Sequence, residues 1–153
     1  CKQLIEEWGH HRGRVHLYGD LTGGQGSRID ESGSSDWDVI LKRFSSVRQW
    51  DIYDQRRRIG SGNANPAVES RVNAVNARCF NAAGESHLLV DPRKKKAFHM
   101  ARDLEGVLLL EGTNEIDKKS NKWLTHVSDA LGYYISAEFP IHLASNSFTQ
   151  LRY

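Results

Sequence analysis

Cysteine is scarce in this sequence, and the usual metal-binding spacings are missing. The 153 residues include 2 cysteines, Cys1 and Cys79, and neither has a CxxC or histidine partner at metal-ligand spacing. We therefore expect reduced thiols and no disulfide framework. The 7 histidines show no HxxxH or HExxH spacing, which argues against a zinc site.

Long apolar runs and a dominant sign of charge are missing as well. The longest apolar run, from Val107 to Leu110, is far shorter than the roughly 18–20 residues that cross a bilayer. We therefore expect no membrane segment and a soluble, cytoplasmic protein. The 21 basic and 19 acidic residues give a formal charge of +2, so net charge does not identify a nucleic-acid binder.

The chain length is that of one domain, since a single core usually serves about 100–200 residues. We expect one domain over residues 1–153, with 141–153 as a C-terminal tail. The 39% of hydrophobic residues is below the globular average of roughly 45–50% and predicts a modest core. A helix-like segment, Leu4 to Trp8, follows Cys1 at once, which indicates the edge of a fragment.

Strand-like and helix-like patterns alternate along the chain and predict an α/β layered fold, with a mixed or parallel sheet covered by helices. Val15 and Leu17 alternate at a strand's period before Gly19 and Asp20, and a Gly/Ser-rich loop follows to Ser35. The expected elements are a strand over 14–20, a helix from Ser35, a weak strand over 50–55, a helix from Asn65 to Gly84, a short strand over 87–92, a helix over 97–107, and a helix over 125–137 that Pro140 stops.

Cap residues and apolar stripes support the three strongest helices. Ser35 is a good N-cap, and Asn65 with Pro66 forms a second start signal. The stripes are Trp37, Ile40, Leu41 and Phe44 in the first helix, Val68, Val72, Val75 and Cys79 in the second, and Val127, Ala130, Leu131, Tyr134 and Ile135 in the third.

Two aspartates stand at positions where carboxylates carry chemistry. Asp20 ends the first strand before the Gly-rich loop, where open α/β sheets bind ligands, although an aspartate there also forms turns. Asp129 borders the apolar stripe of the last helix, where a buried carboxylate needs a cation opposite it, such as a metal ion, and a capping or solvated role is the alternative. The loop from Leu21 to Gly26 lacks a Gly-Lys-Ser/Thr ending, so a nucleotide-binding loop is not expected.

Short basic runs lie next to two predicted loops. Such runs suit duplex phosphates, because each neutralised phosphate releases a counterion, but they also occur as solvated surface. The residues are Arg56, Arg57 and Arg58 in the first run and Lys94, Lys95 and Lys96 in the second.

A series of short motifs, taken in order, resembles the nuclease half of tailed-phage large terminases over roughly Arg14 to Pro140. The motifs are Leu17-Tyr18-Gly19-Asp20 with Thr22-Gly23, Ser35-Asp36-Trp37-Asp38-Val39-Ile40, Asn65-Pro66-Ala67-Val68, Arg71-Val72-Asn73-Ala74-Val75-Asn76, Asp103-Leu104-Glu105 and Thr125-His126-Val127-Ser128-Asp129-Ala130-Leu131-Gly132-Tyr133. The resemblance implies a ribonuclease-H-like fold.

The resemblance also implies a set of site residues. Such nucleases gather three acidic residues around two divalent ions, Mg²⁺ or Mn²⁺. The motifs carry over Asp20 as the fourth-strand ligand and Asp129 as the late-helix ligand, while the first-strand aspartate has no match. Asp20 on the first strand is the alternative, but a hairpin should then follow it, and the sequence has a loop and a helix. We therefore expect the N-terminal β-hairpin strands, and the ATPase before them, to be absent.

The function implied by the resemblance is metal-dependent endonuclease cutting of concatemeric viral DNA during packaging, in the cytoplasm of the bacterial host. The implied partners are double-stranded DNA, the ATPase motor, the small terminase subunit and the portal. A catalytically incomplete terminase fragment, which binds DNA or packaging proteins without cutting, is the alternative. Asp91, His126 and Glu69 are lesser candidate site residues with structural readings of their own.

Overall fold

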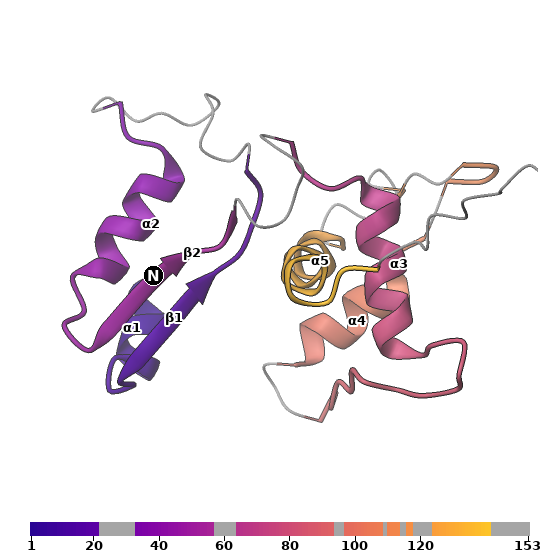
Figure 1. The fold of residues 1–153 in the computed structure, drawn as a ribbon, viewed down its shortest axis with the longest axis horizontal. Helices are drawn as coiled ribbons and strands as arrows, with labels where there is room; N and C mark the ends of the chain where they lie inside the picture. Colours follow the sequence, from indigo (N-terminus) through magenta and orange to yellow (C-terminus); the bar gives the residue numbers. More distant parts are fainter. Residues whose placement is uncertain are drawn as a thin grey trace, which may run out of the picture.

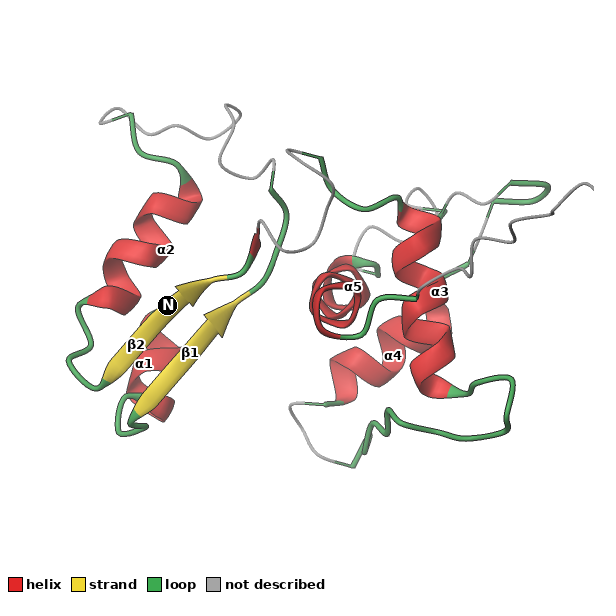
Figure 2. Cartoon of the chain, viewed as in Figure 1, coloured by secondary structure: helices red, strands yellow, loops and turns green. Residues whose placement is uncertain are grey.

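The computed structural model describes residues 1–21, 33–56, 64–93, 97–108, 110–113, 116–117 and 124–141. Within these ranges the chain forms five helices and one two-stranded parallel sheet (Figures 1 and 2). The elements are α1 (Lys2–Trp8), β1 (Gly13–Leu17), α2 (Asp36–Ser45), β2 (Trp50–Asp54), α3 (Val68–Cys79), α4 (Phe98–Gly106) and α5 (His126–Glu138). The expected α/β class is confirmed.

The first half of the chain is a β1–α2–β2 unit. The strands pair in parallel, from Gly13 opposite Trp50 to Leu17 opposite Asp54. Parallel strands end at the same edge of a sheet, so the segments that follow β1 and β2 leave from one edge. That edge is where open α/β sheets bind ligands.

Helix α2 begins where the sequence predicted, because its cap is made locally. The backbone N–H of Asp38 donates to Ser35 Oγ at 3.2 Å, and the N–H of Ser35 donates to Asp38 Oδ2 at 2.9 Å. This reciprocal pair is a capping box, which satisfies two backbone donors at the helix start. The helix lies beside β2, where Phe44 is buried edge-on against Trp50 with ring centroids 5.3 Å apart.

The second half of the chain is a group of helices, drawn beside the sheet in Figure 1. Helix α5 packs against both α3 and α4. Ala74 and Val75 of α3 and Ile135 of α5 form the buried centre of this group. Leu104 and Leu131 pack against this cluster from α4 and α5. Among the residues that the structure describes, no helix has the length and apolar character needed to cross a membrane.

The predicted bounds of α3 were wrong at both ends. The helix begins at Val68 with Ala67 as N-cap, and the side chain of Asn65 makes no cap. Asn65 instead hydrogen-bonds to the segment after β1, where its amide has two partners. The helix ends at Cys79, and Gly84 lies beyond it in a turn with a positive φ of 81°.

The strand predicted over 87–92 was also wrong, because these residues are irregular. The backbone N–H groups of His87 and Leu88 both donate to the carbonyl of Arg78, each at 2.8 Å. Leu89 is 86% exposed, although a core strand would bury it. An apolar run becomes a strand when a neighbouring strand accepts its hydrogen bonds. Here a carbonyl of α3 accepts two of them instead.

The buried face of α5 differs from the predicted stripe. Gly132, Tyr133 and Ile135 are buried, while Tyr134 is 40% exposed. At Gly132 a Cβ atom would lie 3.3 Å from the Cβ of Arg71, so glycine permits close approach of α3. The helix is therefore turned toward an arginine side chain that the apolar pattern does not reveal.

Candidate acidic site

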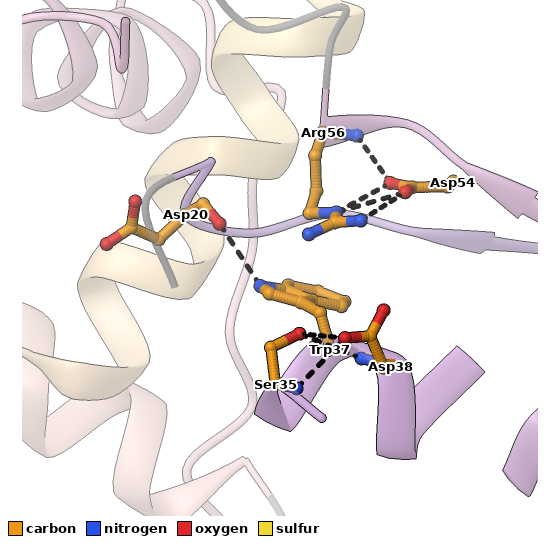
Figure 3. Close-up of polar contacts among 6 residues, drawn as sticks. All are labelled: Asp20, Ser35, Trp37, Asp38, Asp54 and Arg56. Atoms are coloured by element: carbon orange, nitrogen blue, oxygen red, sulfur yellow. Dashed lines mark hydrogen bonds and ion pairs between the residues drawn. The ribbon is translucent and has the colours of Figure 1, made fainter. Parts of the chain in front are cut away.

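Asp20 lies just beyond β1 and is held by contacts from two other segments. Asn65 Nδ2 donates to Asp20 Oδ1 at 2.5 Å, and Asn65 Oδ1 accepts from the backbone N–H of Leu21 at 2.9 Å. The indole N–H of Trp37, at the start of α2, donates to the backbone carbonyl of Asp20 at 3.1 Å (Figure 3). Both the backbone and the carboxylate of Asp20 are therefore positioned by neighbours far away in sequence.

Arg56 is part of the same cluster. Its guanidinium lies 4.4 Å above the ring centre of Trp37 and donates from Nη2 to Asp54 Oδ2 at 2.5 Å (Figure 3). The hydrogen bond to Asp54, more than the charge of Asp54, raises the pKa of Arg56. Arg56, a predicted phosphate contact, thus covers Trp37.

The other predicted basic residues lie outside the described part of the chain: Arg57, Arg58, Lys94, Lys95 and Lys96.

Gly19 is a close-approach position under the same indole. A Cβ atom at residue 19 would lie 2.5 Å from Trp37 Cζ2, which is too short for any real contact. We expect Gly19→Ala to lower the free energy of unfolding by about 1–2 kcal/mol, because overpacking forces the ring or the turn to move. Urea denaturation measures this. The cost should shrink when Trp37→Phe supplies a smaller ring, and an unchanged Gly19→Ala protein would contradict the close packing.

Asp129 lies in the first turn of α5 and is paired with an arginine from α3. Arg71 Nη1 donates to Asp129 Oδ1 at 2.9 Å across 58 sequence positions. Arg71 is buried, at 6% exposure, and its guanidinium lies 4.4 Å from the ring centre of Tyr133. The cation opposite Asp129 in this structure is therefore a side chain of the protein.

The phenol of Tyr133 is buried beside Arg71. Burial raises the pKa of its phenol, the charge of Arg71 opposes this, and the charges of Asp20 and Asp129 each raise the pKa further. Tyr18 joins the halves of the chain, since its hydroxyl donates to Glu138 Oε1 at 2.7 Å. The ring of Tyr18 also lies edge-on to that of Tyr134, with centroids 5.2 Å apart, so the segment after β1 and helix α5 meet at Tyr18.

The N-terminus of α5 is capped by a carboxylate from α4. Asp103 is 2% exposed, and its two oxygens accept from the backbone N–H groups of Thr125 and Ser128, the latter at 2.6 Å. Thr125 has a φ of 99°, a conformation that costs energy for a β-branched residue. Asp103 therefore holds a strained turn in place, and with it the helix that carries Asp129.

The lesser candidates have separate environments. Asp91 pairs with Arg93 at 2.9 Å, and the hydrogen bond from Arg93 lowers the pKa of the carboxyl. Glu69 and His126 are exposed in the first turns of α3 and α5. These surroundings are those of ordinary surface side chains.

Comparison of the chain with protein-family models, with curated proteins and with solved structures found no match. The assignment of a function therefore rests on the sequence motifs and on the geometry around Asp20 and Asp129. In the part of the chain that the structure describes, no group of three or more His, Cys, Asp and Glu side chains is arranged to hold a metal ion.

Sequence reasoning missed four residues of this site: Asn65 as a partner of Asp20, and Arg71, Asp103 and Tyr133 around Asp129. One signal was present, because Arg71 stands three residues after Val68 and four before Val75, within an apolar stripe. A charged residue in such a stripe indicates a buried ion pair. The capping role of Asp103 leaves no comparable pattern in the sequence.

Proposed function

We propose that this chain is part of the nuclease domain of a tailed-phage large terminase, a metal-dependent endonuclease that cuts concatemeric double-stranded DNA. The observation that carries the proposal is the contact between the segment after β1 and helix α5, where the Tyr18 hydroxyl donates to Glu138 Oε1 at 2.7 Å. Asp20 follows the carboxyl end of β1, and Asp129 lies in the first turn of this late helix. This is the arrangement that the motif resemblance implies for the fourth strand and the late helix.

The topology supports the same proposal. A ribonuclease-H-like fold has a parallel strand–helix–strand unit at this point, and β1–α2–β2 is such a unit. Helix α1 then corresponds to the helix before the fourth strand of that fold, and α2 corresponds to the helix before the fifth strand. We propose a ribonuclease-H-like fold for this chain on these grounds.

The residues present do not fit a two-metal centre by themselves. Carboxylate oxygens are suitable ligands for Mg²⁺ or Mn²⁺, and the family chemistry uses three acidic residues. The motifs supply Asp20 and Asp129, and each already accepts a hydrogen bond from a neighbouring side chain.

A second candidate function is favoured by the ion pair at Asp129. A carboxylate whose charge is balanced by Arg71 suits a terminase fragment that binds DNA or packaging proteins without cutting. In both cases the proposed partners are double-stranded DNA, the ATPase motor, the small terminase subunit and the portal, in the cytoplasm of the bacterial host.

Nicking of supercoiled plasmid in Mn²⁺ or Mg²⁺ separates the two functions. We expect the chain to nick weakly or not at all, because two carboxylates supply less negative charge and fewer positioned metal ligands than the family's three. Any residual nicking should fall at least about tenfold in Asp20→Asn and in Asp129→Asn, since loss of even an outer partner of a metal site costs 10–100-fold.

Duplex binding in a salt titration completes the test. Metal-dependent nicking that both substitutions abolish supports the nuclease. Salt-dependent binding without nicking supports the binding function. A chain that neither nicks nor binds duplex DNA would contradict the nuclease and the DNA-binding role, and brisk cleavage that survives Asp129→Asn would contradict the assigned site.

A further inference from the structure

Charge is divided between the two ends of the β1–α2–β2 unit. Near the end where the strands stop, the ionisable side chains include the carboxylates of Asp20, Asp54, Asp36 and Asp38. At the other end, where both strands begin and α2 ends, exposed basic residues gather (lower left in Figure 1). These residues, which we call the basic edge, are Arg12 and Arg14 around the start of β1, Lys42 and Arg43 in the last turn of α2, and Arg48 before β2.

The positive charge of the basic edge is not balanced by carboxylates around it. Residues 8–19 and 39–50, the two segments that supply the basic edge, contain no Asp or Glu. In the part of the chain that the structure describes, none of its five side chains forms an ion pair. Asp51 lies opposite Arg14 in the sheet, but its carboxylate accepts a hydrogen bond from the Tyr53 hydroxyl at 2.8 Å. The basic edge is therefore open to an anionic partner.

Helix geometry explains only part of this arrangement. Lys42 and Arg43 stand in the last turn of α2, where the helix dipole favours a cation. The other three members, all arginines, lie outside the helices. Strand pairing brings them together, since the backbone N–H of Gly13 donates to the carbonyl of Gln49 at 3.0 Å. Like charges repel one another, so a one-signed group of this kind is typical of a surface that attracts a polyanion.

We propose that the basic edge binds the phosphate backbone of duplex DNA, an inference that rests on the proposed function for the identity of the polyanion. Each phosphate that an arginine neutralises releases a counterion, and such contacts position a duplex without reading its sequence. The basic edge is one strand of 5 residues away from the end of β1 that precedes Asp20, or roughly 16 Å. It therefore holds DNA at a distance from the two aspartates.

Fluorescence anisotropy of a labelled duplex, in a salt titration without divalent ions, tests the proposal. Arg12→Ala/Arg14→Ala/Arg48→Ala should bind the duplex at least about tenfold more weakly at low salt. The slope of log affinity against log salt should fall by roughly 2–3, because each lost phosphate contact removes about 0.9. Lysine at the same three positions should keep most of the binding, since lysine contacts phosphate as a point charge.

Arg102→Ala is the matched control, because Arg102 is an exposed arginine on α4, in the other half of the chain. Arg48→Ala alone should lower the salt slope by about 1, and Arg102→Ala should leave it unchanged. Equal slopes for the triple variant and the natural chain would overturn the proposal. Binding of poly-glutamate as tight as that of duplex DNA would overturn the assignment to DNA.

A folding defect in the triple variant does not remove the test. Arg12→Ala/Arg48→Ala keeps Arg14, whose guanidinium lies 5.5 Å from the ring centre of Tyr53. This double variant should still lower the salt slope by about 2, and an unchanged slope would count against the basic edge. Duplex binding that the substitutions weaken, in a chain that never nicks plasmid, supports the basic edge and contradicts the nuclease function alone. Nicking that requires Asp20, with duplex binding that ignores the substitutions, supports the nuclease and overturns the basic edge.

Discussion

Asp103→Ala is expected to lower the free energy of unfolding by roughly 2–5 kcal/mol. The substitution removes the acceptors of two backbone N–H groups at the start of α5, those of Thr125 and Ser128. Each buried donor left without a partner costs about 1–3 kcal/mol. The strained Thr125 also loses the contact that holds it, so the first turn of α5 should open.

Urea denaturation with circular dichroism measures this effect. Asp103→Asn should lie between the natural chain and Asp103→Ala, because its amide keeps one acceptor oxygen. Glu105→Ala is the matched control, since Glu105 is exposed on the same helix and should change stability by less than about 0.5 kcal/mol. Equal effects of Asp103→Ala and Glu105→Ala would show that the cap contributes little.

Asp129→Ala is expected to destabilise the fold by about 3 kcal/mol, more than Arg71→Met does. The order follows from burial, because the side chain of Arg71 is 7% exposed and that of Asp129 is 25% exposed. Removing Asp129 leaves a buried guanidinium without its carboxylate partner. Removing Arg71 leaves a carboxylate that water still reaches. The unequal burial therefore predicts unequal single effects.

A double-mutant cycle checks the pairing. Arg71→Met in the Asp129→Ala background should recover part of the loss, with a coupling energy of about 1–3 kcal/mol between the two sites. Unfolding should be measured without divalent ions, so that metal binding does not contribute. Additive effects of the two substitutions would mean that the pair seen in the structure carries no stability.

The predictions that succeeded depend on residues close together in the chain. The capping box joins Ser35 to Asp38, three positions away, so its geometry follows from α2 itself. The strand β2 and the helices containing Leu104 and Asp129 likewise follow from local periodicity. Their observed ends differ from the predicted ones by at most one residue.

The predictions that failed were decided by distant partners. Asn65 is a good cap by its chemistry, yet its side chain is held by the backbone and carboxylate of the segment after β1, 44 and 45 positions away. The residues after α3 have a strand-like pattern, but no neighbouring strand in the described structure pairs with them. A local preference worth about 1 kcal/mol gives way when long-range contacts offer more.

By itself, the sequence determined the α/β class, the order of most elements and the position of Asp129 in a late helix. The strand expected over 14–20 instead ends at Leu17, three residues before Asp20. The tertiary structure alone decided what surrounds these carboxylates. Which of two adjacent tyrosines, Tyr133 or Tyr134, faces inward depends on how α5 packs against α3. An apolar pattern specifies that a helix buries a face, but the rotation that places Arg71 against Asp129 is set by the shapes of two helices in contact.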